Sequence, residues 1–264
     1  MSDPVAQRFA ELQATGRRAL VVDLTAGYPG SEESIELMRR VVAAGADIVE
    51  VGVPFSDPMA DGPVIQASSQ LALEGGMTFN ATLELIRRAA LDVPVVLFSY
   101  LNPILAAGED ALERAAAAGV HGLLVTDLPV GADPELEARL ASGPLALVRL
   151  VAPTTPVERM AEISGSGSGF IYVISRLGVT GMSEGVATDL RDTIERLRSV
   201  STLPVCVGFG ISNGDQAREV AELADGVVVG SALVRAAGDS IEAAEELTRE
   251  LRAAIDGVGL AAAG

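Results

Sequence analysis

The chain has 264 residues, 49% of them hydrophobic, which suits one large buried core. We therefore predict one domain over residues 1–264. The formal net charge of −17 argues against nucleic acid and membrane surfaces as partners, because both require a basic face. Apolar runs stay far below the roughly 20 residues of a membrane span, and the amino terminus lacks a secretory signal pattern. We expect a cytoplasmic protein.

The residue types that the chain lacks restrict its chemistry. All 19 basic residues are arginine, which excludes a Schiff base on lysine. The one histidine, His121, precedes a predicted strand, and the one cysteine, Cys206, lies within an apolar run. This pair does not provide a zinc or copper site. We expect no metal and no cofactor in this chain, and proton transfer by Asp, Glu or Tyr.

In chain order, an extra helix is predicted over Val5–Thr15, and β-branched segments then alternate with amphipathic segments. The eight predicted strands are Ala19–Thr25, Asp47–Val51, Pro94–Tyr100, Gly122–Thr126, Leu145–Leu150, Phe170–Ile174, Pro204–Phe209 and Gly226–Val229. Eight strands that alternate with helices predict an α/β fold of the (β/α)₈ barrel type, with its active site at the carboxyl ends of the strands. A doubly wound sheet is the alternative, but Thr25-Ala26-Gly27-Tyr28 lacks its glycine-rich turn.

Helix boundaries have their own signals. Asp133 before Pro134 is typical of an N-cap, and the segment 155–158 predicts a capping box that starts at Thr155. Gly45 and Gly119 are typical of helix ends. A short extra helix is predicted over Ser231–Ala236, after the eighth strand.

Glycine-rich loops at the carboxyl ends of the strands are candidates for binding a phosphate group. They are Gly208-Phe209-Gly210 after the seventh strand, Gly230-Ser231 after the eighth, and Gly178-Val179-Thr180-Gly181 after the sixth. In many barrels such loops and a helix amino terminus present free N–H groups to phosphate. Tight-turn packing is the alternative for each glycine.

Candidate residues for proton transfer lie in the second strand, in the loop after it and in the sixth strand. Alternation places Glu50 on the face of Ile48, and burial there would suit it to proton transfer. A buried ion pair with an arginine is the alternative. In the next loop, Asp61 is either functional or the cap of the following helix. Tyr172, in the sixth strand, is either a hydrogen-bond donor or a packing residue.

Longer motifs resemble one known family. The run from Glu50 to Pro58, continued by Ala60-Asp61-Gly62-Pro63, is similar to the signature of the tryptophan synthase α subunit. Further similar segments lie in order along the chain: Tyr100-Leu101-Asn102-Pro103, Thr126-Asp127-Leu128-Pro129, Ala152-Pro153-Thr154-Thr155, Tyr172 through Ser175-Arg176, Gly178-Val179-Thr180-Gly181, Gly208-Phe209-Gly210-Ile211-Ser212 and Gly230-Ser231.

The resemblance implies retro-aldol cleavage of indole-3-glycerol phosphate to indole and glyceraldehyde 3-phosphate. It also implies a β subunit as partner in an α2β2 assembly, which carries pyridoxal phosphate and receives the indole through a tunnel. By resemblance, Glu50 and Asp61 are the catalytic residues. The implied substrate-binding residues are Tyr100, Leu124 and Tyr172 around indole, Thr180 in the lid, and Gly181, Phe209, Gly210, Gly230 and Ser231 around phosphate.

Two positions depart from this resemblance. Asp23 lies in the first strand, where an apolar or aromatic lining is expected, and Thr126 replaces a small apolar residue. Three alternatives stay open: another enzyme among the phosphate-binding barrels, a barrel without activity that serves as a scaffold, and a free-standing indole-forming lyase. The first group includes indole-3-glycerol phosphate synthase. Its reaction resembles one that needs lysine, which this chain lacks.

Overall fold

The computed structural model describes residues 3–174, 184–208 and 210–261. Eight parallel strands form a closed barrel in which β8 pairs with β1. They are β1 (Ala19–Thr25), β2 (Ile48–Gly52), β3 (Val95–Ser99), β4 (Gly122–Val125), β5 (Ala146–Val151), β6 (Ile171–Ile174), β7 (Val205–Gly208) and β8 (Gly226–Val229). The predicted barrel is confirmed, and each predicted strand lies within one residue of its observed ends among the described residues. The doubly wound alternative is wrong.

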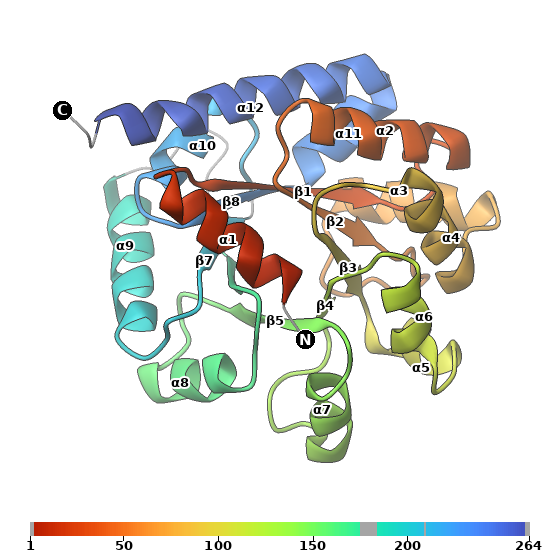
Figure 1. Ribbon diagram of the computed structural model, residues 1–264, viewed down its shortest axis with the longest axis horizontal. Coiled ribbons are helices and arrows are strands. Elements are labelled where there is room, and N and C mark those ends of the chain that lie inside the picture. The colour runs from red at the N-terminus through yellow and green to blue at the C-terminus, as the bar shows by residue number, and fades with distance from the viewer. Residues whose placement is uncertain (1–2, 175–183, 209, 262–264) are drawn as a thin grey trace.

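Helices surround the barrel (Figure 1). They are α1 (Pro4–Ala14), α2 (Ser31–Ala43), α3 (Pro63–Glu74), α4 (Phe79–Ala89), α5 (Leu101–Ala106), α6 (Ala111–Ala117), α7 (Pro134–Ala141), α8 (Val157–Gly165), α9 (Glu184–Arg198), α10 (Gly214–Ala221), α11 (Ser231–Asp239) and α12 (Ile241–Ala261). The extra helix before β1 and the short helix after β8 are therefore both present.

The strands are buried on both faces, which explains why they are apolar without strict alternation. One apolar cluster lies between the strands and the outer helices. A second fills the barrel, and Val5, Phe9 and Leu12 of α1 belong to it together with inward residues such as Ile48 and Phe170. Figure 1 shows α1 lying across the end of the barrel that faces the viewer. This helix therefore closes the barrel floor.

The helix signals are confirmed with one correction. The Asp133 carboxylate accepts the Leu136 N–H at the start of α7, and Gly45 and Gly119 adopt positive φ angles of 113° and 98°. The capping box at Thr155 is wrong: the N-cap of α8 is Pro156. The Thr155 hydroxyl instead accepts the N–H of Ala152 at 3.1 Å, within its own loop.

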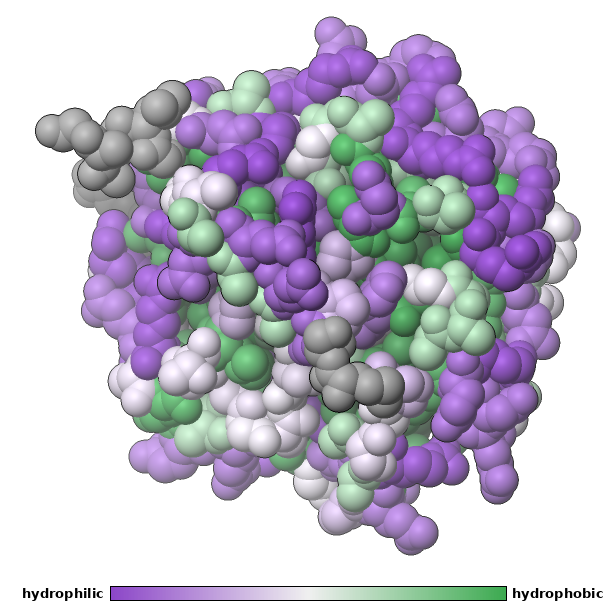
Figure 2. All heavy atoms as spheres, viewed as in Figure 1, coloured by the Kyte–Doolittle hydropathy of each residue, from purple (hydrophilic) through white to green (hydrophobic). Residues whose placement is uncertain are grey.

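The surface agrees with the acidic composition. On the face seen in Figure 2, hydrophilic residues cover much of the outer ring of helices.

His121 lies at the floor end of β4, where its Nδ1 accepts the N–H of Val95 at 3.2 Å, and Cys206 is fully buried. Within the described ranges, every helix is too short or too polar to cross a membrane.

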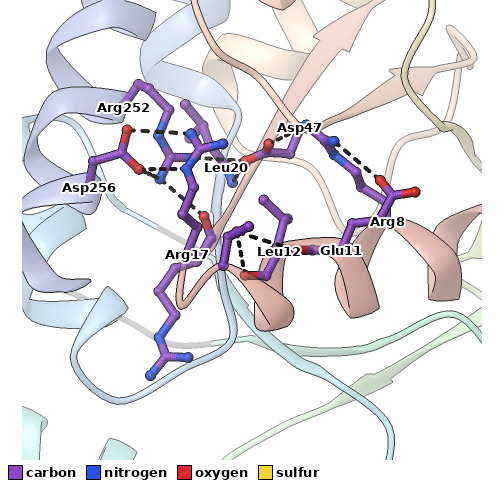
Figure 3. Close-up of polar contacts among 10 residues, drawn as sticks. Arg8, Glu11, Leu12, Arg17, Leu20, Asp47, Arg252 and Asp256 are labelled. Atoms are coloured by element: carbon purple, nitrogen blue, oxygen red, sulfur yellow. Dashed lines mark hydrogen bonds and ion pairs between the residues drawn. The ribbon is translucent and has the colours of Figure 1, made fainter. Parts of the chain in front are cut away.

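A buried ion-pair network ties the floor of the barrel together (Figure 3). The Asp47 carboxylate, just before β2, accepts hydrogen bonds from Arg252 of α12 and Arg8 of α1, both at 2.7 Å. It also accepts the N–H of Leu20 in β1 at 2.9 Å, while Arg252 reaches Asp256 at 2.7 Å. One carboxylate thus joins the first two strands, the floor helix and the last helix.

We expect Asp47→Asn to lower the free energy of unfolding by about 3 kcal/mol, because removing one member of a buried pair leaves the other charge uncompensated. Asn keeps an acceptor for the backbone of β1. Arg88→Met, which breaks the exposed pair with Glu32, should cost about 0 to 1 kcal/mol. Urea unfolding followed by far-ultraviolet circular dichroism measures both losses. Similar losses for the two variants would contradict the role of the network.

Candidate active site

The interior of the barrel changes from apolar to polar toward the carboxyl ends of the strands. Val21 and Ile48 belong to the apolar filling. Because side chains alternate along a strand, the residues two positions further, Asp23 and Glu50, face the same interior, and the two strands pair them in register. The polar end of the barrel therefore begins with two neighbouring carboxyl groups.

Glu50 is fully buried, and neither of its carboxyl oxygens has a hydrogen-bond partner among the residues that the structure describes. The alternative of an ion pair with arginine is therefore wrong. Burial raises the pKa of Glu50 well above its ordinary value, and the charge of Asp23 raises it further. The raised pKa favours the protonated carboxyl group, which can donate its proton to a substrate.

Asp61 lies in the loop between β2 and α3. The N-cap of α3 is Gly62, without a side-chain hydrogen bond, so Asp61 is not the helix cap. Burial raises the pKa of Asp61, and a hydrogen bond with the Tyr100 side chain lowers it. Its carboxyl group therefore contacts the Tyr100 side chain and does not cap α3.

Tyr100 holds this loop in place. Its hydroxyl accepts the N–H of Ala60 at 2.9 Å, and its ring lies 5.2 Å from that of Phe55, between centroids. Burial raises the pKa of Tyr100 to about 12, so the phenol stays protonated. The resemblance implies a place for Tyr100 in the pocket, and the structure brings it together with Asp61.

Tyr172 and Leu124 lie on the inner face of the barrel. Leu124 is fully buried within the apolar filling. The Tyr172 phenol lies over Gly208, where any side chain would collide with the phenol oxygen. Burial raises the pKa of Tyr172 well above its ordinary value, as do the charges of Glu50 and Asp23. Tyr172 is thus a neutral hydrogen-bond donor close to the carboxyl groups.

The amino terminus of α11 is open. Its N-cap is Gly230, which has no side-chain hydrogen bond, and Ser231 is exposed. The first N–H groups of a helix have no partner within the helix and attract anions. Gly210 is exposed, with a positive φ of 82°. Thr180, Gly181 and Phe209 lie outside the described residues.

Asp23 is the residue whose importance the sequence analysis missed. It was noted only as a departure from an apolar wall, yet it faces Glu50 across the strand pair. Burial raises the pKa of Asp23 to about 7, and the charge of Asp61 contributes to the rise. The signal in the sequence is its spacing: Asp23 follows Val21 by two residues, as Glu50 follows Ile48.

Comparisons with known proteins agree with this geometry. The family model described as tryptophan synthase alpha chain matches residues 9–262. The tryptophan synthase alpha chain of Opitutus terrae is 45% identical over 252 residues, which cover 94% of this chain and 95% of the relative.

Solved structures give the same result. A tryptophan synthase chain of Mycobacterium tuberculosis in an aminoacrylate-bound form superposes with a TM-score of 0.86 at 35% identity, covering 96% of this chain and all of that chain. The tryptophan synthase subunit alpha of Legionella pneumophila superposes with a TM-score of 0.88 at 32% identity, covering 97% and 100% of the two chains. The chain belongs to the tryptophan synthase alpha chain family.

Proposed function

We propose that this chain cleaves indole-3-glycerol phosphate to indole and glyceraldehyde 3-phosphate. The observation that carries the proposal is the carboxyl group of Glu50, buried at the active end of the barrel without a hydrogen-bond partner in the described ranges. Family membership supplies the substrate, and Asp61 supplies a second carboxyl group in the loop that follows the same strand.

The reaction needs a proton at carbon 3 of the indole, so that the ring can accept the electrons of the carbon–carbon bond. Glu50 begins protonated and donates this proton. It then takes the proton of the adjacent hydroxyl group as the bond breaks and the aldehyde forms, so that its proton is restored. Asp61 stabilises the positive charge that develops on the indole nitrogen. Positioned acid–base catalysis of this kind contributes about 10²- to 10⁴-fold.

The two ends of the substrate match two parts of the site. The backbone N–H groups at the start of α11 serve as the phosphate site, together with Gly210, which lies in the loop after the neighbouring strand β7. This device needs no basic side chain, in keeping with the acidic chain. Leu124, Tyr172 and Tyr100 form the indole pocket. For Thr180, Gly181 and Phe209, the role given by the resemblance remains a proposal.

We further propose a β subunit as partner, in an α2β2 assembly. The solved relatives include a tryptophan synthase of Mycobacterium tuberculosis and a tryptophan synthase subunit alpha of Legionella pneumophila. In this chain, the loop that carries Asp61 also carries Met59, whose side chain is 84% exposed, so apolar surface lies beside the site. Pyridoxal phosphate belongs to the partner, because this chain has no lysine for a Schiff base.

The direct test supplies indole-3-glycerol phosphate and measures indole, with and without a β subunit. We expect slow release by the isolated chain and faster release with the β subunit. Glu50→Gln and Asp61→Asn should each lower kcat by about 10²- to 10⁴-fold with little change in KM, because both groups act on charge that develops during the reaction.

Three outcomes contradict parts of this account. Near-normal turnover by Glu50→Gln would remove Glu50 from the chemistry, and equal stimulation of the β subunit by that variant would favour a scaffold without catalysis. Fast turnover by the isolated chain, unaffected by the β subunit, would favour a free-standing lyase.

The raised pKa of Glu50 also predicts a pH effect on stability. A folded state that holds a proton more tightly than the unfolded chain loses stability as pH rises from the ordinary value, about 4.3, through the raised value. Glu50→Gln cannot titrate. The free energy of unfolding of Glu50→Gln, relative to that of the parent, should therefore grow with pH. The total growth is about 1.4 kcal/mol for each unit by which the fold raises the pKa of Glu50.

Urea unfolding of parent and Glu50→Gln at pH 5, 7 and 9 measures this difference. A stability difference that stays constant across these pH values would show that Glu50 titrates normally in the folded protein.

A further inference from the structure

Asp23 is a third carboxyl group in the site, and the reaction described above does not use it. It lies on the inner face of β1, in register with Glu50 of β2. On its other side, Asp23 lies close to the start of α11: a Cβ atom built on Gly230 would lie 2.6 Å from Oδ2 of Asp23. Asp23 therefore lies between the acid–base residue and the helix terminus assigned to phosphate.

The Asp23 carboxyl group has no hydrogen-bond partner among the described residues, and it is partly accessible from the interior. The ionisable groups that act on it include Asp61, Glu50 and the phenol of Tyr172, none of which is a cation. A carboxyl group that is partly removed from water and has no protein partner makes fewer hydrogen bonds than it can accept. Such a group is satisfied when a ligand brings a donor to it.

A metal ion is one ligand that carboxyl groups bind. However, the described residues include no group of three or more His, Cys, Asp or Glu side chains placed to hold one. A ligand can instead present a neutral hydroxyl group as the hydrogen-bond donor to Asp23. A neutral donor avoids the loss of solvation that a buried cation would suffer, so a hydroxyl group of the substrate fits this position.

The proposed substrate carries two hydroxyl groups on the chain between indole and phosphate. The first, next to indole, gives its proton to Glu50. The second is one carbon closer to phosphate, and the chain must pass Asp23 on its way from Glu50 to Gly230. We propose that Asp23 is a further substrate-binding residue that accepts a hydrogen bond from this second hydroxyl group. The inference rests on the proposed substrate.

Asp23 would then determine specificity as well as affinity. A hydrogen bond to a charged group is worth about 1.5 to 3 kcal/mol, or about 10- to 100-fold. The parent should therefore prefer indole-3-glycerol phosphate over the analogue that lacks only the second hydroxyl group by about this factor in kcat/KM. A site built for a hydroxyl group discriminates strongly against its absence.

The test compares both substrates with the parent, Asp23→Asn and Asp23→Leu. In Asp23→Leu the preference should fall to about 1, because kcat/KM drops for the full substrate and not for the deoxy analogue. Asp23→Asn keeps an acceptor oxygen and should be intermediate. Leu24→Val is the matched control, since Leu24 packs in the outer apolar cluster beside the same strand, and it should keep the parental preference.

Indole-3-propanol phosphate, which has neither hydroxyl group, tests whether the site stays intact. Asp23→Leu should bind it at least as well as the parent does, whereas a misfolded site would lose it. A lower kcat/KM for both substrates by the same factor would overturn the proposal and show a structural role. A lower kcat with an unchanged preference would also overturn it, and would place Asp23 in proton transfer.

A binding experiment separates this inference from the proposed function. In the Glu50→Gln background, calorimetry with the full substrate and the deoxy analogue measures the same preference without turnover. If the parent releases no indole but Glu50→Gln binds the full substrate about 10- to 100-fold more tightly, and Asp23→Leu removes this difference, then Asp23 binds the hydroxyl group and the proposed reaction is wrong. Failure to bind either compound overturns both.

Discussion

The closed barrel removes water from the carboxyl group of Glu50, and none of the described residues offers it a hydrogen bond. This follows from the packing of the interior: the apolar filling reaches from α1 up to residues such as Leu124, and the polar side chains begin directly above it. The raised pKa of Glu50, the influence of Asp23 on it and the need for a protonated donor in the reaction all depend on that dry position.

The two ends of the barrel have different tasks. At the floor, Asp47 is buried as well, but three hydrogen-bond donors from different elements satisfy it (Figure 3). At the carboxyl ends, Glu50 and Asp23 have no hydrogen-bond partner within the part of the chain that the structure describes, which costs stability and leaves them free to bind and react with a substrate. A folded barrel can tolerate this cost because the floor, with α1 and α12, supplies stabilising contacts elsewhere.

Much of the fold could be predicted because β-branched strands and amphipathic helices repeat in a regular order, and Glu50 interrupts one of the strands visibly. The N-cap of α8 could not be predicted. The Thr155 hydroxyl can accept an N–H group of the helix or one of its own loop, and only the loop geometry selects Ala152. Asp61 looked equally suited to capping α3. The role of Asp23 depends on contacts with β2 and with Gly230, which are distant in sequence and become visible only when the barrel closes.

The central claim is that the fold keeps Glu50 protonated near neutral pH in the free protein. Carbon-13 NMR of protein labelled at the side-chain carboxyl carbons of glutamate measures this directly, with Glu50→Gln used to assign the signal. We expect one carboxyl group that keeps its proton well above the ordinary glutamate range and disappears in the variant. A Glu50 signal that titrates near its ordinary pKa, about 4.3, would contradict the account.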